Sequence, residues 1–114
     1  MKSNNDNERT IQSIQKDISD FVSKRDWKKH HNPVNLSEAI IVEAGELLQL
    51  FLFTTHKVIE KEAKTKSHLR ERIEEELADI LIYSLELADH LDMDVSDIIT
   101  KKLEKSSKKH PAIT

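Results

Sequence analysis

Hydrophobic residues recur at intervals of three and four along most of the chain, which is the spacing of amphipathic helices. The first such segment, residues 8–24, carries its apolar residues at Ile11, Ile14, Ile18, Phe21 and Val22. The same spacing predicts longer helices over residues 36–59 and 67–91 and a shorter helix over residues 95–108. No alternation typical of strands and no internal repeat is present. The pattern therefore predicts an all-α fold.

Capping residues and proline suggest where these helices begin. Pro33 disfavours helical geometry at Asn32, so residues 25–34 are expected to be partly irregular. Asn35, with a glutamate three residues later, resembles a capping box and predicts the start of the second helix. Asp94, with an acid three residues later, predicts the start of the last helix in the same way.

The composition agrees with one helical domain. The 114 residues include one glycine and two prolines, and 34% are charged. We expect a disordered polar tail at residues 1–7 and a single domain at residues 8–111, built as a four-helix bundle-like protomer. A net charge of −3 gives no indication of nucleic-acid binding. The absence of cysteine excludes disulfides and zinc–thiolate sites.

No apolar run approaches the roughly 20 residues that cross a membrane, and the polar start has no signal-peptide core. We therefore expect a cytoplasmic protein without a membrane partner. The two long helices are apolar on more than one side, through Ile41, Leu48, Phe51, Leu81, Ile82 and Leu85. Such helices are buried on several sides, so we expect a homodimer or a dimer of dimers, with a well-covered monomer as the alternative.

Two pairs of carboxylates lie inside the most apolar stretches of the chain. Glu43 and Glu46 belong to the second predicted helix, and Glu76 and Asp79 belong to the third. At 100° per residue, both pairs fall on the apolar stripe that should face a neighbouring helix. Ionised acids are costly to bury there without a positive partner. Four acids converging from two helices therefore predict a divalent metal site.

The acids of these helices also allow other interpretations. A further Glu-x-x-Asp pair, Glu86 and Asp89, is rotated off the stripe and is therefore not preferred as a ligand pair. A di-iron bundle would use Glu-x-x-His motifs, and none of the six histidines has a glutamate three residues before it. Solvated helix edges, or acids balanced by a base such as Arg72, remain the structural alternatives.

Ligands that offer only oxygen favour Mg²⁺, with Mn²⁺ as a substitute. Such ions keep positions that substrate phosphates can occupy, and they neutralise phosphate charge and activate water. The acid cluster therefore predicts hydrolysis of a phosphoryl or nucleotidyl substrate. A non-catalytic helical interaction protein, or an antitoxin-like regulatory dimer, is the alternative function. Nucleic-acid binding through the basic C-terminal segment is a third, which the net negative charge disfavours.

The arrangement Glu43-x-x-Glu46, a spacer and Glu76-x-x-Asp79 resembles the signature of the MazG-like all-α nucleoside triphosphate pyrophosphohydrolases. The likeness runs from about residue 8 to Pro111. It is similar to the dCTP pyrophosphatase branch in the segments 25–27, 31–36, 43–51 and 75–83.

This resemblance implies Mg²⁺-dependent cleavage of a (deoxy)nucleoside triphosphate between its α- and β-phosphates, giving monophosphate and pyrophosphate. It implies a house-cleaning role in the dNTP pool, with dCTP-like or modified dNTP substrates. Glu43, Glu46, Glu76 and Asp79 would hold the metal ions, and Glu43 or Glu46 would also act as the catalytic base. Family members form homodimers or homotetramers with sites built across subunits.

The resemblance also implies a set of substrate-binding residues. Trp27 and Phe53 would stack on the base, and Phe21 would line the same space. The polar and phosphate-facing members of the set are His31, Tyr83, Lys102, Lys105 and Lys109. Ile18 stands where pyrimidine-specific relatives carry a histidine, so the resemblance leaves the base preference open.

Overall fold

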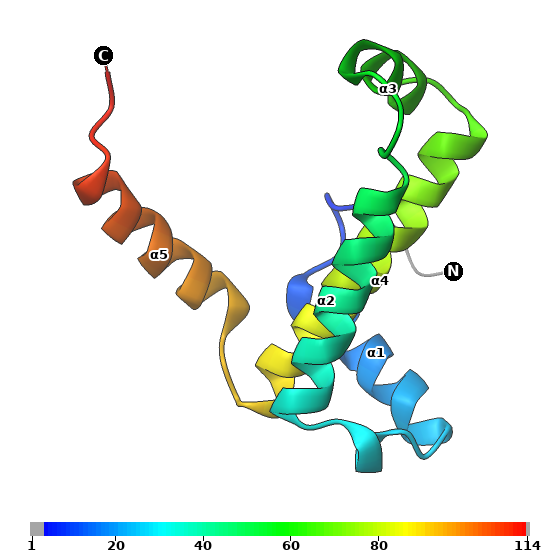
Figure 1. Cartoon of the computed structure of the whole chain (residues 1–114). Helices are drawn as coiled ribbons and strands as arrows, with labels where there is room; N and C mark the ends of the chain where they lie inside the picture. Colours follow the sequence, from blue (N-terminus) through cyan, green and yellow to red (C-terminus); the bar gives the residue numbers. More distant parts are fainter. Residues whose placement is uncertain (1–3, 114) are drawn as a thin grey trace.

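The computed structural model describes residues 4–113 of the chain, and throughout that range it confirms the predicted all-α fold. Its elements are α1 (Ile11–Lys24), the 3-10 turn η1 (Lys28–His30), α2 (Pro33–Gln49), α3 (His56–Ala63), α4 (His68–His90) and α5 (Val95–Lys109). Figure 1 shows α2 lying along α4, with α1 beside α4, α3 at one end and α5 projecting away. No helix of the described range is long and apolar enough to cross a membrane.

The predicted tail, residues 1–7, falls partly outside the described residues. Within the described part, the Asn5 carbonyl accepts hydrogen bonds from the backbone N–H groups of Glu8 and Arg9. These bonds form a turn directly ahead of α1. The disorder predicted for residues 1–7 stays a prediction.

Every α-helix begins at a side chain that caps it. In each case the oxygen of the capping residue accepts a hydrogen bond from the backbone N–H three residues later, which would otherwise lack a partner. The caps are Thr10, Asn32, Thr55, Ser67 and Asp94. The predicted cap at Asp94 is confirmed, with 2.9 Å between Asp97 N and Asp94 Oδ1.

The predicted start of the second helix at Asn35 is wrong by three residues. Asn32 is the cap, and its Oδ1 lies 2.9 Å from Asn35 N. Pro33 therefore occupies the first helical position, where its missing N–H costs nothing. The Asn35 side chain instead donates to the carbonyl oxygen of His30 at 2.8 Å.

The predicted helix over residues 36–59 is also wrong, because it is broken into α2 and α3. Turns follow Leu50, and Phe53 adopts a left-handed backbone conformation with φ of 63°. This conformation is unfavourable for a residue with a β-carbon and does not continue a right-handed helix. Thr55 then caps α3 through a bond from Val58 N.

The core within one chain is small. Its buried apolar side chains are Val22 of α1, Leu36 of α2 and Ala88 of α4. Large apolar residues of α2 and α4 remain exposed, including Ile41 (73%) and Leu81 (53%). The helix pair is thus covered on one side by α1 and left uncovered over a broad apolar surface.

The predicted four-helix bundle-like protomer is not what the single chain forms. A bundle of this kind would bury the apolar residues of its last helix, which are Val95, Ile98, Ile99 and Leu103. In the structure α5 runs apart from α2 and α4 (Figure 1), and Ile98, Ile99 and Leu103 are exposed. The connection into α5 contains Asp92 with φ of 55°, which turns the chain away after α4.

The cap at Asn32 can be tested by Asn32→Ala. We expect a loss of about 1 kcal/mol in the free energy of unfolding, because the N–H of Asn35 loses its acceptor. Urea unfolding followed by circular dichroism measures it. Ser37→Ala, at an exposed position inside the same helix, is the control and should cost less than about 0.5 kcal/mol. Equal stability of Asn32→Ala and wild type would contradict the cap.

Candidate functional site

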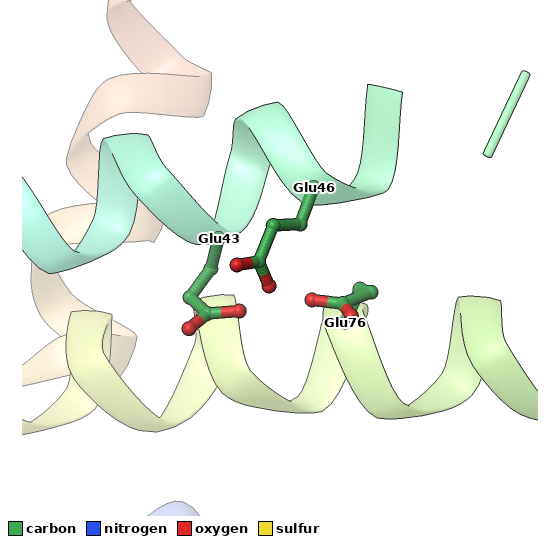
Figure 2. Close-up of side chains that lie close together, drawn as sticks. All are labelled: Glu43, Glu46 and Glu76. Atoms are coloured by element: carbon green, nitrogen blue, oxygen red, sulfur yellow. The ribbon is translucent and has the colours of Figure 1, made fainter. Parts of the chain in front are cut away.

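Three carboxylates from two helices meet at the contact between α2 and α4. Glu43 and Glu46 of α2 and Glu76 of α4 each offer one oxygen, and these oxygens lie within 4.8 Å of one another. Figure 2 shows the two α2 side chains reaching towards α4, where Glu76 faces them. The i, i+3 spacing brings both acids of α2 to the face that packs on α4.

The cluster carries negative charge that the described residues do not balance. Oε2 of Glu43 and Oε2 of Glu76 are shielded from solvent and have no hydrogen-bond partner. Burial, together with the neighbouring carboxyl groups of Glu76 and Glu46, raises the pKa of Glu43 to about 7. No lysine or arginine forms an ion pair with these three acids in the range the structure describes.

The donor set fits a divalent cation that prefers oxygen. Three carboxylates within reach of one point, two of them with orphaned buried oxygens, supply hard ligands and the charge that such an ion neutralises. The set contains neither histidine nor thiolate, which favours magnesium or manganese over zinc or copper. Glu43, Glu46 and Glu76 are thus the residues able to hold a metal.

Asp79, the fourth predicted ligand, lies close to this cluster without joining the 4.8 Å group. Its charge contributes to the raised pKa values of Glu43 and Tyr83. Its side chain also lines a cavity that begins where the acid cluster ends. Asp79 therefore stands between the cluster and the cavity.

That cavity has a volume of about 440 Å³, within the range of small-molecule sites. It is lined by four predicted substrate residues, namely Phe21, Trp27, His31 and Tyr83. The rings of Phe21 and Trp27 pack edge to face, with 5.6 Å between centroids and 71° between planes. Both residues remain about half exposed, but the Arg25 guanidinium carbon lies over the Phe21 ring, 3.6 Å from its centroid, so Trp27 is the better placed of the two to stack on a flat ligand.

Four other predicted substrate residues are not brought to the site within one chain. Phe53 is fully exposed in the turn between α2 and α3. The remaining three are exposed on α5, which runs away from α2 and α4 in Figure 1; they are Lys102, Lys105 and Lys109. Their roles stay predictions.

One residue of the site was not singled out from the sequence. Glu86 of α4 is buried, with 7% of its side chain exposed, and its Oε2 has no hydrogen bond. Its pKa is raised to about 7, because burial outweighs the opposing effect of the Lys28 charge. The Glu86-x-x-Asp89 pair was recognised but discarded as off the metal stripe. Its position between Leu85 and Leu87 was the signal that could have shown a buried acid.

His31 faces Glu86 across the same cavity wall. Its Nδ1 lies 3.6 Å from Glu86 Oε2, which is longer than a hydrogen bond. Burial lowers the pKa of His31, and the nearby His30 and His90 lower it further. The imidazole is therefore neutral at pH 7, with one ring nitrogen able to donate and the other to accept.

Comparison with known proteins places these features in context. Residues 39–114 match the MazG-like family. The chain is 31% identical over 104 residues to dCTP pyrophosphatase 1 of Mus musculus and 34% identical over 106 residues to that of Bos taurus. Both alignments cover 91% of this chain and 61% of the relative. The chain thus spans less than two thirds of the length of these curated relatives.

A solved structure resembles the whole chain. The crystal structure of a pyrophosphatase from Archaeoglobus fulgidus DSM 4304 gives a TM-score of 0.78 at 28% identity. The likeness covers 98% of this chain and 99% of that one. It therefore includes α5 as well as the helices that carry the acids.

The raised pKa of Glu43 predicts a pH effect on the metal-free protein. Its pKa is about 7 in the fold and 4.5 ordinarily, so folding favours the protonated form. The stability that the fold gains from protonated Glu43 is complete below pH 4.5 and is lost as the pH rises through 7. Relative to Glu43→Gln, wild type in EDTA should lose of the order of 1 kcal/mol between pH 4.5 and 7.5, since solvent screens part of the shift.

Urea unfolding at several pH values measures this difference. Comparing the two proteins cancels the opposite trend from His31, whose lowered pKa makes the fold more stable as the pH rises. Glu75→Gln, on the exposed side of α4, should leave the pH profile unchanged. Parallel profiles for wild type and Glu43→Gln would contradict the unbalanced burial of Glu43.

Proposed function

This chain belongs to the MazG-like family, and we propose that it hydrolyses nucleoside triphosphates between the α- and β-phosphates, releasing monophosphate and pyrophosphate. The observation that carries the proposal is the meeting of Glu43, Glu46 and Glu76 beside a cavity walled by aromatic rings. An acid cluster suits a metal-bound triphosphate, and an adjacent aromatic cavity suits its base. The names of the relatives, dCTP pyrophosphatase 1, support deoxynucleotide substrates.

The acids have separate tasks in this proposal. Glu43, Glu46 and Glu76 would hold Mg²⁺, with Asp79 at the edge nearest the cavity. Magnesium, when bound, neutralises phosphate charge and lowers the pKa of water. Glu46 is the exposed member of the three, so its carboxylate is the one best reached by an attacking water, whose proton it would accept.

The cavity residues would hold the nucleoside. Trp27 offers a ring on which a base can stack, and Phe21, whose ring is covered by the Arg25 guanidinium, lines the same cavity. Tyr83 lies one helical turn after Asp79 and lines the same cavity, so its hydroxyl would reach the sugar between phosphates and base. Substrates of the dCTP type, or modified dNTPs removed in house-cleaning, fit this description.

Self-association would complete the molecule. The exposed apolar residues of α2 and α4 need a cover that this chain does not provide. The apolar side of α5 is likewise uncovered, and a second copy, as a homodimer or homotetramer, would satisfy both. The α5 residues Lys102, Lys105 and Lys109 would then approach the phosphates bound by another copy.

A product assay on canonical and modified dNTPs tests the activity. With Mg²⁺ present, we expect monophosphate and pyrophosphate in equal amounts, separated by chromatography. Glu46→Ala and Asp79→Ala should each reduce kcat/KM by at least about 100-fold. Each variant removes a carboxylate that would hold the metal ion, and that ion would stabilise the charge of the phosphates. Glu75→Ala, one residue before the ligand Glu76 but exposed, should retain wild-type activity.

Other products or no turnover would give different conclusions. Diphosphate plus phosphate would keep the metal site and refute cleavage between the α- and β-phosphates. Full activity of both variants would refute the assignment of the acids. Folded wild type that turns over no nucleotide with Mg²⁺ would favour the non-catalytic interaction protein.

The proposed self-association is tested by Leu81→Glu. Leu81 is 53% exposed on α4, and a charge buried there in an interface would be costly. We expect sedimentation equilibrium to show wild type as a dimer or larger and a dissociation constant raised at least about 100-fold in the variant. Gln12→Glu, on the exposed side of α1, adds the same charge and should not alter the assembly. A monomeric wild type would contradict the proposal.

A further inference from the structure

A second acid of α4, Glu86, lines the aromatic cavity along with Asp79. The 440 Å³ cavity adjoins a smaller one of about 230 Å³. Their common wall consists of Ile18, Val22, His31 and Glu86, all of which line both cavities. Glu86 is the one acid of that wall and stands two helical turns beyond Asp79.

The side chain of Glu86 lacks the partners that a buried structural acid needs. Only 7% of its side chain is exposed, and its Oε2 accepts no hydrogen bond. The imidazole of His31, at 3.6 Å, is too far away to donate one. A buried carboxyl group without a donor is destabilising. The missing donor is therefore expected from a molecule in the cavity.

The other acids of the larger cavity have different surroundings. Asp17 is paired with Arg9, with 2.7 Å between Oδ2 and Nη2. Asp79 lies at the end next to the metal cluster. Glu86 is thus the carboxyl group left to meet the part of a ligand that lies farthest from the phosphates.

We propose that Glu86 is a specificity-determining residue that accepts a hydrogen bond from the exocyclic amino group of a base stacked on Trp27. The inference rests on the proposed function, since it assumes that the cavity holds the base of the nucleotide. Cytosine and adenine carry such an amino group, whereas uracil and hypoxanthine carry a carbonyl oxygen at the same place. A carboxyl oxygen accepts from an amino group whether or not the acid is ionised.

Discrimination between amino-bearing and deaminated bases follows from whether the base offers Glu86 a hydrogen-bond donor or an acceptor. With an amino-bearing base, the orphaned oxygen gains its donor and the buried acid is satisfied. With the deaminated base, at a pH above about 7 where Glu86 is ionised, a carbonyl oxygen faces a carboxylate that has nothing to donate. Since Glu86 is shielded from water, solvent does not compensate for the mismatch. Amino-bearing substrates are therefore preferred over their deaminated counterparts.

Two matched substrate pairs test this proposal, dCTP with dUTP and dATP with dITP. We expect wild type to show a higher kcat/KM for the amino-bearing member of each pair. Glu86→Ala should reduce that preference by roughly 10-fold or more, mainly through slower turnover of the amino-bearing member. Asp89→Ala, one turn further on α4, lines the smaller cavity but not the larger and should keep the wild-type ratio.

A second variant guards against loss of folding in Glu86→Ala. Glu86→Gln keeps the shape and adds an N–H donor that a carbonyl oxygen can accept, so dUTP and dITP should gain relative to their partners. An equal fall for both members of each pair, or unchanged ratios in both variants, would overturn the proposal. Either result would show that Glu86 acts only through the structure.

Binding measurements separate this inference from the proposed function. Calorimetry with the non-hydrolysable α,β-imido analogues of dCTP and dUTP needs no turnover. Preferential binding of the dCTP analogue that depends on Glu86, in a protein that hydrolyses nothing, would refute the activity and retain the role of Glu86. Turnover with no preference in wild type would retain the activity and refute the role of Glu86.

Discussion

The contact between α2 and α4 forces like charges together, and the rest of the site depends on it. The apolar stripes of the two helices drive them into contact, since removing that surface from water is favourable. The same stripes carry Glu43, Glu46 and Glu76, so packing the helices also brings three carboxylates within 4.8 Å. Two oxygens are left buried without partners. The hydrophobic contact thus holds mutually repelling carboxylates together, and a bound divalent cation would relieve that repulsion.

The small size of the core makes this repulsion important. Of residues 4–113, only Val22, Leu36 and Ala88 are buried apolar residues, while a folded domain is stabilised by only about 5–15 kcal/mol. Mutual repulsion among three acids is a substantial fraction of that figure. Binding of metal, and cover of the exposed faces of α2 and α4 by another copy, would both act on the folded state by mass action. Stability and function are therefore coupled through the same helix pair.

Most of the local structure could be predicted from the sequence, and the failures have physical causes. The starts of α4 and α5 follow from capping residues whose bonds are local. The break at residues 50–55 was missed because apolar residues continue through it, so the spacing is the same with or without a turn at Phe53. Asn32 and Asn35 are both good caps, and Pro33 decided between them. The direction of α5 could not be predicted, because an amphipathic pattern shows that a face is apolar and not what covers it.

The acids of α4 also show that periodicity identifies the face of a helix but not what that face contacts. Periodicity placed Glu76 on the stripe that meets α2, and it set Glu86 aside because that residue faces elsewhere. What Glu86 faces is α1 and the turn that carries His31, a contact set by the tertiary path of the chain. At 1.5 Å per residue, Glu76 and Glu86 stand about 15 Å apart along a rigid helix. In the proposed function, the acid that would hold metal and the acid that would contact the base are therefore fixed relative to each other by α4 alone, so a substrate would have to satisfy both at one spacing.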